Sequence, residues 1–281
     1  MKPRRGVEAT SMTTIDDRAI AEYVRFACHL ADLAGVTILP YFRTRIDVEN
    51  KNAGAGFDPV TLADKAAERV IRDEIQRVHP GHAILGEEHG ATAGTDALTW
   101  IIDPIDGTRA FIIGQLHWGV LIALNDGERP IVGVMHQPYT GETFLGSRLG
   151  AEMRRGSSSG PLKVRECPRL EDAIVSATDP AMFTGPGERD AFRALAAKAR
   201  MRRYGGDCYS YCLLAAGFID LVIESRLKPY DIQPLIPIIE AAGGIVTSWL
   251  GESPYEGGQI IAAGDRDLHK IALAILAPAA R

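Results

Sequence analysis

Apolar positions recur at helical spacing over two long stretches near the start of the chain. From Asp16, a residue type suited to an N-cap, apolar residues follow every three or four positions as far as Pro40, which predicts an amphipathic helix. A second stretch after Thr61 has the same spacing and ends at Pro80-Gly81, so we predict a second helix there. No such pattern precedes position 15, and we expect residues 1–14 to form a disordered tail.

Short apolar runs come next, and two of them stop at acidic residues. Ala83-Ile84-Leu85 leads into Gly86-Glu87-Glu88, and Trp100-Ile101-Ile102 leads into Asp103. Buried strands that end at a functional edge give this pattern. Alternating segments over 118–145, with the turn signal Asn125-Asp126-Gly127, predict an antiparallel meander.

The second half of the chain alternates predicted strands with predicted helices, which is typical of an α/β arrangement. The serine- and glycine-rich stretch Arg155–Gly160 is the best candidate for a linker between the halves. We therefore predict an N-terminal α+β lobe with antiparallel sheet over 15–154 and a C-terminal α/β lobe over 161–281, packed as a layered α-β-α-β-α sandwich. The predicted strands span 174–177, 221–224, 245–248 and 260–263, and the predicted helices span 188–198, 209–216, 233–242 and 267–276.

Composition narrows the classes of partner. The 281 residues are 46% hydrophobic, which is enough for a substantial core. Lysines and arginines are scattered and the net charge is −5, so there is no electrostatic footprint for nucleic acid or an anionic membrane. The four cysteines form no Cys-x-x-Cys pair and no segment approaches about 18 apolar residues. We expect a cytoplasmic protein that acts on small molecules.

The strongest chemical signal is the string Asp103-Pro104-Ile105-Asp106-Gly107-Thr108. Proline prevents a simple continuation of the strand, so the chain must turn and can direct both aspartates and a backbone carbonyl toward one point. Oxygen ligands alone favour Mg²⁺ or Mn²⁺ over Zn²⁺. Gly107 and Thr108 are predicted to begin a helix whose amides hold a phosphate. A plain acidic turn that caps a helix is the alternative, and the preceding buried strand argues against it.

Three further acids are weaker candidates individually. Glu87-Glu88 alone would be a solvated loop, but a second acidic strand end about 15 residues later makes it a source of ligands for a pair of cations. Asp231 begins a helical run and could be an N-cap, a ligand, or both. Asp64 lies in a helical first turn, where acids are common anyway.

Two segments look like known functional motifs but do not match their spacing. Asp106-Gly107-Thr108 resembles the end of the Asp-x-Asp-Gly-Thr nucleophile motif of haloacid-dehalogenase phosphatases, but the two aspartates here are three positions apart rather than two. Gly185-Pro186-Gly187 lacks the third glycine of a dinucleotide-binding loop.

The sequence resembles the inositol monophosphatase family of lithium-sensitive, Mg²⁺-dependent phosphatases over residues 16 to 278. Three motifs carry the resemblance: Gly86-Glu87-Glu88, the block Trp100–Thr108, and Asp231 followed by Ala242-Gly243-Gly244. The resemblance implies a homodimer with two or three Mg²⁺ ions per site. It implies that Glu87 and Thr108 orient an attacking water and that Asp64 holds a metal-bound water and polarises Thr108. Glu224 would contact a substrate hydroxyl, and Lys51 resembles the lysine of a flexible loop. The implied metal ligands are Glu87, Asp103, the carbonyl of Ile105, Asp106 and Asp231.

Departures from the inositol-hydrolysing members concern the substrate. Arg109-Ala110-Phe111 replaces Thr or Lys followed by Asn-Phe, and Asp207 stands where a small residue faces the sugar ring. A carboxylate there suits an ammonium or imidazolium group, and the segments around Tyr204–Tyr211 and Leu227–Asp231 look like the histidinol-phosphatases of the family. We therefore predict hydrolysis of histidinol phosphate, with Arg203, Asp207, Glu224 and Asp231 at the substrate.

Alternatives stay open at this point. Asp207 could instead cap the helix that begins at Cys208. The substrate could be an inositol phosphate or a sugar bisphosphate. A non-catalytic scaffold that assists transcription antitermination would need a basic surface, which the net charge of −5 does not favour.

Overall fold

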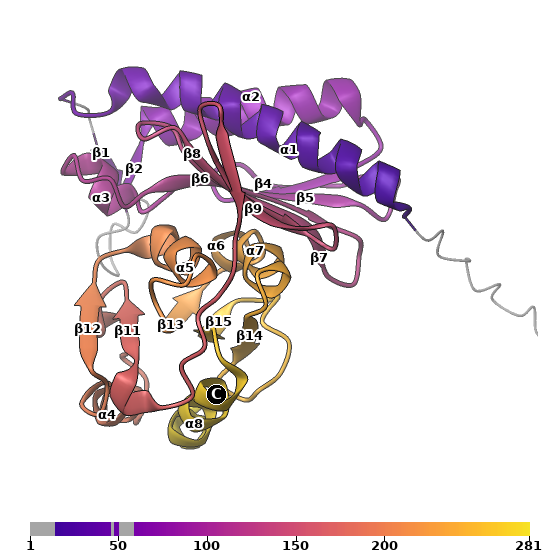
Figure 1. Cartoon of the computed structure of the whole chain (residues 1–281). Coiled ribbons are helices and arrows are strands. Elements are labelled where there is room, and N and C mark those ends of the chain that lie inside the picture. The colour runs from indigo at the N-terminus through magenta and orange to yellow at the C-terminus, as the bar shows by residue number, and fades with distance from the viewer. Residues whose placement is uncertain (1–14, 46–47, 51–58) are drawn as a thin grey trace, which may run out of the picture.

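The computed structural model describes residues 15–45, 48–50 and 59–281. The predicted tail 1–14 and Lys51 lie outside the described residues. Within the described part, the chain forms an eight-stranded sheet, a five-stranded sheet and a two-stranded ribbon, with helices arranged in layers around the two large sheets (Figure 1).

The elements of the first half, in chain order, are α1 (Asp17–Ile38), β1 (Val48–Asn50), β2 (Pro59–Thr61), α2 (Leu62–Val78), β3 (Ala83–Gly86), β4 (Gly90–Thr92), β5 (Thr99–Asp106), α3 (Thr108–Ile112), β6 (Gly119–Asn125), β7 (Pro130–Gln137), β8 (Glu142–Ser147), β9 (Gly150–Arg155) and β10 (Ser158–Pro161). Those of the second half are β11 (Ile174–Ala177), α4 (Glu188–Ala196), β12 (Met201–Tyr204), α5 (Asp207–Ala215), β13 (Leu221–Leu227), α6 (Pro229–Ile232), α7 (Leu235–Ala241), β14 (Ile245–Ser248), β15 (Gly258–Ala263) and α8 (Arg266–Leu276).

The two predicted N-terminal helices are confirmed as α1 and α2. Asp16 caps α1 by accepting a hydrogen bond from the Ala19 amide at 2.8 Å, and Thr61 with Asp64 forms a capping box at the start of α2. Both helices turn their apolar stripes onto one face of the eight-stranded sheet (Figure 1). The two helices therefore cover one face of the strands β3 and β5, which lead to the acidic residues.

The eight strands lie in the order β10-β9-β8-β7-β6-β5-β3-β4. All neighbours pair antiparallel except β3 and β5, which are parallel, so the predicted meander is confirmed. The prediction of a linker over Arg155–Gly160 is wrong, because these residues belong to the β9–β10 hairpin, with Ser158 paired to Arg155. Small polar residues suit an exposed edge hairpin as well as they suit a linker, and composition alone could not separate the two.

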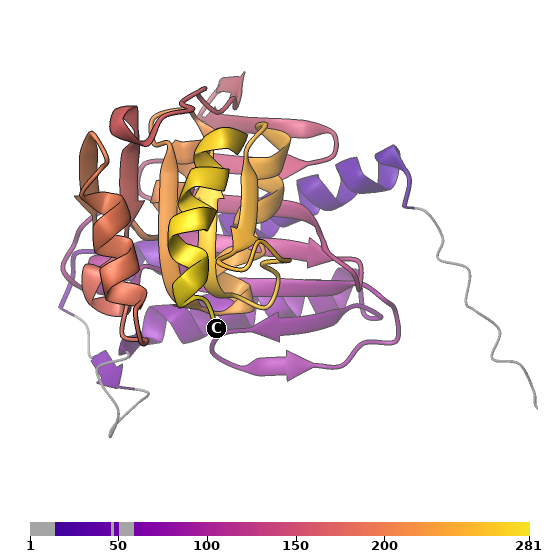
Figure 2. The ribbon, with the colours of Figure 1, turned by 90° about the horizontal axis from the view of Figure 1, so that it is seen from below.

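The five-stranded sheet has the order β12-β11-β13-β15-β14, with β12, β11 and β13 parallel and β15 antiparallel to both of its neighbours. Helices α5, α6 and α7 lie between the two sheets, while α4 and α8 cover the far face of the smaller sheet (Figures 1 and 2). The predicted α/β sandwich is confirmed at this level. The helix predicted over 233–242 is confirmed as α7. The structure adds a short helix before it, α6, and Pro234, which has no N–H to donate, separates the two. No helix among the described residues is long and apolar enough to span a bilayer.

A histidine pair lies beneath α1, away from the acids. The rings of His79 and His82 stack with centroids 4.5 Å apart, and the indole N–H of Trp100 donates to His82 Nδ1 at 3.1 Å. Burial lowers the pKa of His82 to about 4, and His79 acts in the same direction while Asp96 opposes it. His82 is therefore neutral in the folded chain over a range of pH in which an unfolded histidine is charged.

We expect this histidine to make the fold sensitive to acid. Below about pH 6.5 the unfolded chain takes up a proton that the folded chain does not, so the contribution of His82 is present above that pH and is lost as the pH falls toward 4. Between pH 7.5 and 5, wild type should lose about 1 kcal/mol more unfolding free energy than a His82→Asn variant, after a discount for partial exposure. Urea unfolding at both pH values measures this, and equal losses would contradict it.

Candidate active site

A bulge in β5 places the two aspartates of the central string on one side of the sheet. Asp103 pairs with Leu121 and Asp106 with Gly119 on β6, so three steps along β5 correspond to two along β6. Side chains alternate along a regular strand, and residues three apart would point to opposite faces. The extra residue, next to Pro104, restores a common face.

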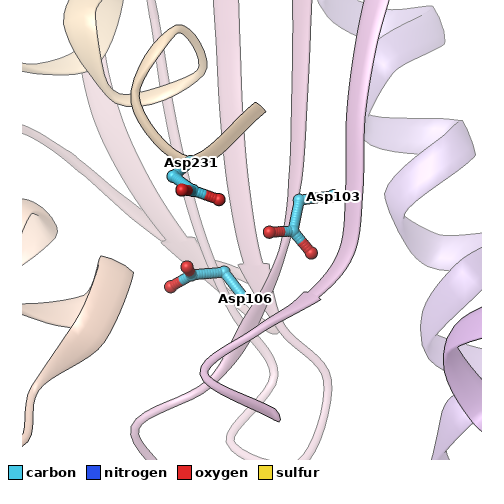
Figure 3. Close-up of side chains that lie close together, drawn as sticks. All are labelled: Asp103, Asp106 and Asp231. Carbon is cyan, nitrogen blue, oxygen red and sulfur yellow. The ribbon is translucent and has the colours of Figure 1, made fainter. Parts of the chain in front are cut away.

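Asp231 joins these aspartates from the other half of the chain. It lies in the short helix α6, where its carboxylate accepts a hydrogen bond from the Lys228 amide at 2.7 Å. Figure 3 shows Asp103, Asp106 and Asp231 directed toward one another, and one oxygen of each lies within 4.8 Å of the others. Such a cluster can hold a cation between carboxylate oxygens.

Glu87 reaches the same place because β3 runs parallel to β5. The carboxyl ends of parallel neighbours meet at one edge of a sheet, and the Glu87 amide donates to the carbonyl of Ile102 at 3.2 Å. The Glu87 charge is the largest cause after burial that raises the pKa of Asp103. The structure thus brings the four carboxylates of the sequence prediction together.

These acids, of which Asp103 is buried and Glu87, Asp106 and Asp231 are half-buried, oppose one another's ionisation. Burial and then Glu87, Asp106 and Asp231 raise the pKa of Asp103 well above its usual range. Burial and then Asp106 raise the pKa of Asp231 well above its usual range. Burial also raises the pKa of Asp106 to about 6, although an amide N–H from Cys208, at 2.7 Å, opposes the shift. A divalent cation would remove this repulsion.

Asp64 supplies an independent sign that a polar group fits beside the cluster. Its side chain is fully buried, and Oδ2 accepts hydrogen bonds from the Thr61 amide at 2.9 Å and from the Thr61 hydroxyl. The other oxygen, Oδ1, is buried and has no hydrogen-bond partner among the described residues. Buried polar atoms are rarely left without one, so the donor set fits a hard cation with its water.

Gly107 and Thr108 begin a helix as predicted. Gly107, in the left-handed region at φ 84°, is the N-cap of α3. A Cβ at this position would come within 2.5 Å of the His117 carbonyl oxygen, so only glycine permits this turn. The Thr108 hydroxyl donates to the Ile105 carbonyl at 3.0 Å, which leaves that oxygen a second lone pair for a cation.

A cleft opens in front of these groups. An outer part of about 470 Å³ is bordered by α3, by residues 178–182 and by the end of β13. A smaller part of about 90 Å³ extends inward to Tyr211 and Glu224. Asp106, Asp207 and Asp231 border both parts. A larger hollow of about 710 Å³, between α1 and strands β8–β10, contains none of the site residues.

Asp207 combines a left-handed backbone with a raised carboxyl pKa. Its backbone is left-handed at φ 42°, a conformation that costs a non-glycine residue about 1 kcal/mol or more. The N-cap of α5 is Gly206, and α5 has no side-chain cap, so the alternative that Asp207 caps this helix is wrong. Burial raises the pKa of Asp207 to about 8, with Asp106 and Glu224 adding to the shift and Arg109 opposing it.

Glu224 lies deeper, on β13. Its carboxylate accepts hydrogen bonds from the Thr178 amide at 2.8 Å and from the Tyr211 hydroxyl at 3.3 Å. Burial raises the pKa of Glu224 to about 7. The inner part of the cleft is therefore acidic on two sides.

Comparison with known proteins decides what this arrangement is. The model of the inositol monophosphatase family matches residues 20–280. The chain belongs to the inositol monophosphatase family. The bifunctional phosphatase IMPL2, chloroplastic, of Arabidopsis thaliana is 37% identical, over 96% of this chain and 79% of that protein. A histidinol-phosphatase of Chlorobaculum parvum is 32% identical, over 86% and 92%. A solved inositol monophosphatase from Zymomonas mobilis has a TM-score of 0.81 and 38% identity, over 92% and 98%.

Membership of the inositol monophosphatase family makes this chain a relative of phosphoric monoester hydrolases, and two observations refine the residues predicted for its site. Arg203 is exposed on the edge strand β12 and does not border either part of the cleft. Several cleft residues were not foreseen, namely Thr178, Asp179, Met182, Tyr211, Ser225 and Arg226. Tyr211 lies on α5, within the segment Tyr204–Tyr211 that the sequence analysis singled out, although no role was predicted for it. The others lie on β13 or in the segment that follows β11, where the sequence carries no motif.

Proposed function

We propose that this protein is a Mg²⁺-dependent phosphatase that hydrolyses L-histidinol phosphate to L-histidinol and phosphate. The observation that carries the choice of substrate is the strained, half-buried Asp207, whose carboxylate borders the cleft beside Glu224 without capping its helix. A cationic leaving alcohol would satisfy both acids through charge-assisted hydrogen bonds.

The division of roles follows from the positions of the groups. Glu87, Asp103, Asp106, Asp231 and the Ile105 carbonyl would hold Mg²⁺, for which Mn²⁺ could substitute. When bound, Mg²⁺ supplies positive charge that polarises the phosphoryl group and makes water more acidic. Glu87 and Thr108 orient the attacking water, and Asp64 accepts a hydrogen bond from a polar group through its unpaired oxygen. The amides of Gly107 and Thr108 hold phosphate oxygens, so this chain contributes chiefly by positioning.

A polyol phosphate such as inositol 1-phosphate is the second candidate, and Arg109 is the observation that favours it. The Arg109 charge lowers the pKa of Asp207 against the effect of burial. A carboxylate partly balanced by this arginine could accept hydrogen bonds from neutral hydroxyl groups instead.

Phosphate release decides between the two. The metal-free chain is given Mg²⁺ with histidinol phosphate, inositol 1-phosphate or fructose 1,6-bisphosphate in parallel. We expect kcat/KM to be at least about tenfold higher for histidinol phosphate, since a charged hydrogen bond contributes about 1.5–3 kcal/mol. A preference for inositol 1-phosphate would reject the proposed substrate, and no release from any ester would reject the phosphatase itself.

A further inference from the structure

Glu68 and Arg72, on α2, form a buried pair that lies behind the Glu87 loop rather than in the cleft. The Glu68 side chain is fully buried and that of Arg72 is 11% exposed, and Arg72 Nε donates to Glu68 Oε1 at 2.6 Å. Surface pairs on helices are common, but a buried ion pair is a poor stabiliser compared with apolar packing. Its presence in this place points to a role other than stability.

The pair binds the backbone that carries the metal-type carboxylate. Glu68 accepts hydrogen bonds from the amide of Glu88 at 2.7 Å and from the amide of His89 at 3.1 Å. Arg72 donates to the Gly90 carbonyl and, at 3.0 Å, to the Thr92 hydroxyl. The two side chains thus fix the three residues that follow Glu87 and the side chain of Thr92.

Glu87 itself is held from its other side by β5, through the bond from its amide to the Ile102 carbonyl. Its position is therefore set between a strand and a charged pair on a helix. Gly86 makes the arrangement possible, because a Cβ there would come within 2.1 Å of Glu68 Oε1 and 2.8 Å of Arg72 Nη2. The glycine of Gly86-Glu87-Glu88 is needed so that Glu68 can reach the amides.

We propose that Glu68 and Arg72 are positioning residues, which hold the Glu87 carboxylate where it can bind the metal. The inference rests on the proposed Mg²⁺-dependent function. Neither residue borders the cleft, and both act on Glu87 through the backbone of residues 88–90. Groups that orient a ligand in this way typically change metal affinity 10–100-fold when they are replaced.

The test is the Glu68→Gln variant, which keeps the shape of the side chain. Glutamine has one acceptor oxygen, and its NH₂ would face a backbone N–H or the Arg72 guanidinium, so at least one anchoring bond is lost. Mg²⁺ binding is measured by calorimetry without substrate, together with the Mg²⁺ dependence of phosphate release. We expect the Mg²⁺ dissociation constant to rise about 10–100-fold, with KM for the ester at saturating Mg²⁺ within about threefold of wild type.

Two further variants make the result decisive. Glu74→Gln, on the same helix, removes a carboxylate that pairs with Arg77 and His29 at the surface, and it should bind Mg²⁺ as wild type does. Arg72→Lys keeps the positive charge beside Glu68 but loses the forked guanidinium group that reaches Gly90 and Thr92. This variant should weaken Mg²⁺ binding at least about threefold, and it provides the test if Glu68→Gln does not fold. If Glu68→Gln and Arg72→Lys fold and bind Mg²⁺ as tightly as wild type, whatever their melting temperatures, the positioning role is overturned but the proposed phosphatase function is not. Absence of Mg²⁺ binding by wild type would overturn the proposed function as well.

Discussion

Replacing Asp103 by asparagine should leave a folded protein that releases phosphate at least about 10³-fold more slowly, because loss of one ligand charge removes several kcal/mol of transition-state stabilisation. Asparagine can still accept the hydrogen bond that Asp103 Oδ1 receives from the Ile105 amide at 3.0 Å, so the turn is preserved. Without metal, the variant should be more stable than wild type by about 1 kcal/mol, since one of several mutually repelling buried carboxylates is gone. The expected signature is an inactive enzyme with a raised melting temperature.

The measurement combines activity with thermal unfolding. Mg²⁺ at about 100 times its dissociation constant should stabilise wild type by about 2.7 kcal/mol and raise its melting temperature by about 5–10 °C, whereas Asp103→Asn should show little of this rise. Asp190→Asn, an exposed change on α4, is the matched control and should behave as wild type. An Asp103→Asn variant that keeps a tenth of the activity, or that melts earlier than metal-free wild type, would contradict the assignment.

Asp207→Asn should change which ester is preferred. Asparagine adopts left-handed backbone more readily than most residues, so the turn before α5 survives while the charge is lost. We expect kcat/KM for histidinol phosphate to fall about 10–150-fold, which corresponds to a charged hydrogen bond of about 1.5–3 kcal/mol. Inositol 1-phosphate should be hydrolysed as well as before or better.

The ratio of the two kcat/KM values is the quantity to compare. Asp179→Asn is a matched control, because Asp179 borders the same cleft and its capping bond to the Ala181 amide can be replaced by asparagine. That variant should keep the wild-type ratio. If Asp207→Asn also keeps it, Asp207 does not select the substrate.

Local signals in the sequence were enough for the long helices and for the acidic strand ends. Asp16 is a cap whose chemistry depends on a few neighbouring residues, and the structure places it as expected, whereas the capping role of Thr61 was not predicted. The edge hairpin over 155–160 was missed because the pairing of Ser158 with Arg155 depends on a sheet that already exists. The short helix α6, before Pro234, was not predicted as a helix of its own.

The candidate site divides in the same way. Glu87, Asp103 and Asp106 follow apolar runs, and strand pairing alone brings them to one edge. Asp207 was singled out from the sequence, but its left-handed backbone depends on how α5 packs against the Asp106 carboxylate. Glu68 could not be found from the sequence, because a glutamate within a helix looks like any solvated residue until the loop above it is seen.

The bulge in β5 also explains why the Asp-x-Asp motif and the Asp103-x-x-Asp106 string, although similar in sequence, form different sites. Aspartates two positions apart share a face of any regular strand, so Asp-x-Asp needs no special backbone. Aspartates three positions apart, as in Asp103 and Asp106, converge only if one residue is looped out opposite β6. Deleting Pro104 or Ile105 would therefore be more damaging than replacing either one, because it would return the strand to strict alternation and give it the spacing of another phosphatase class without that class's nucleophile geometry.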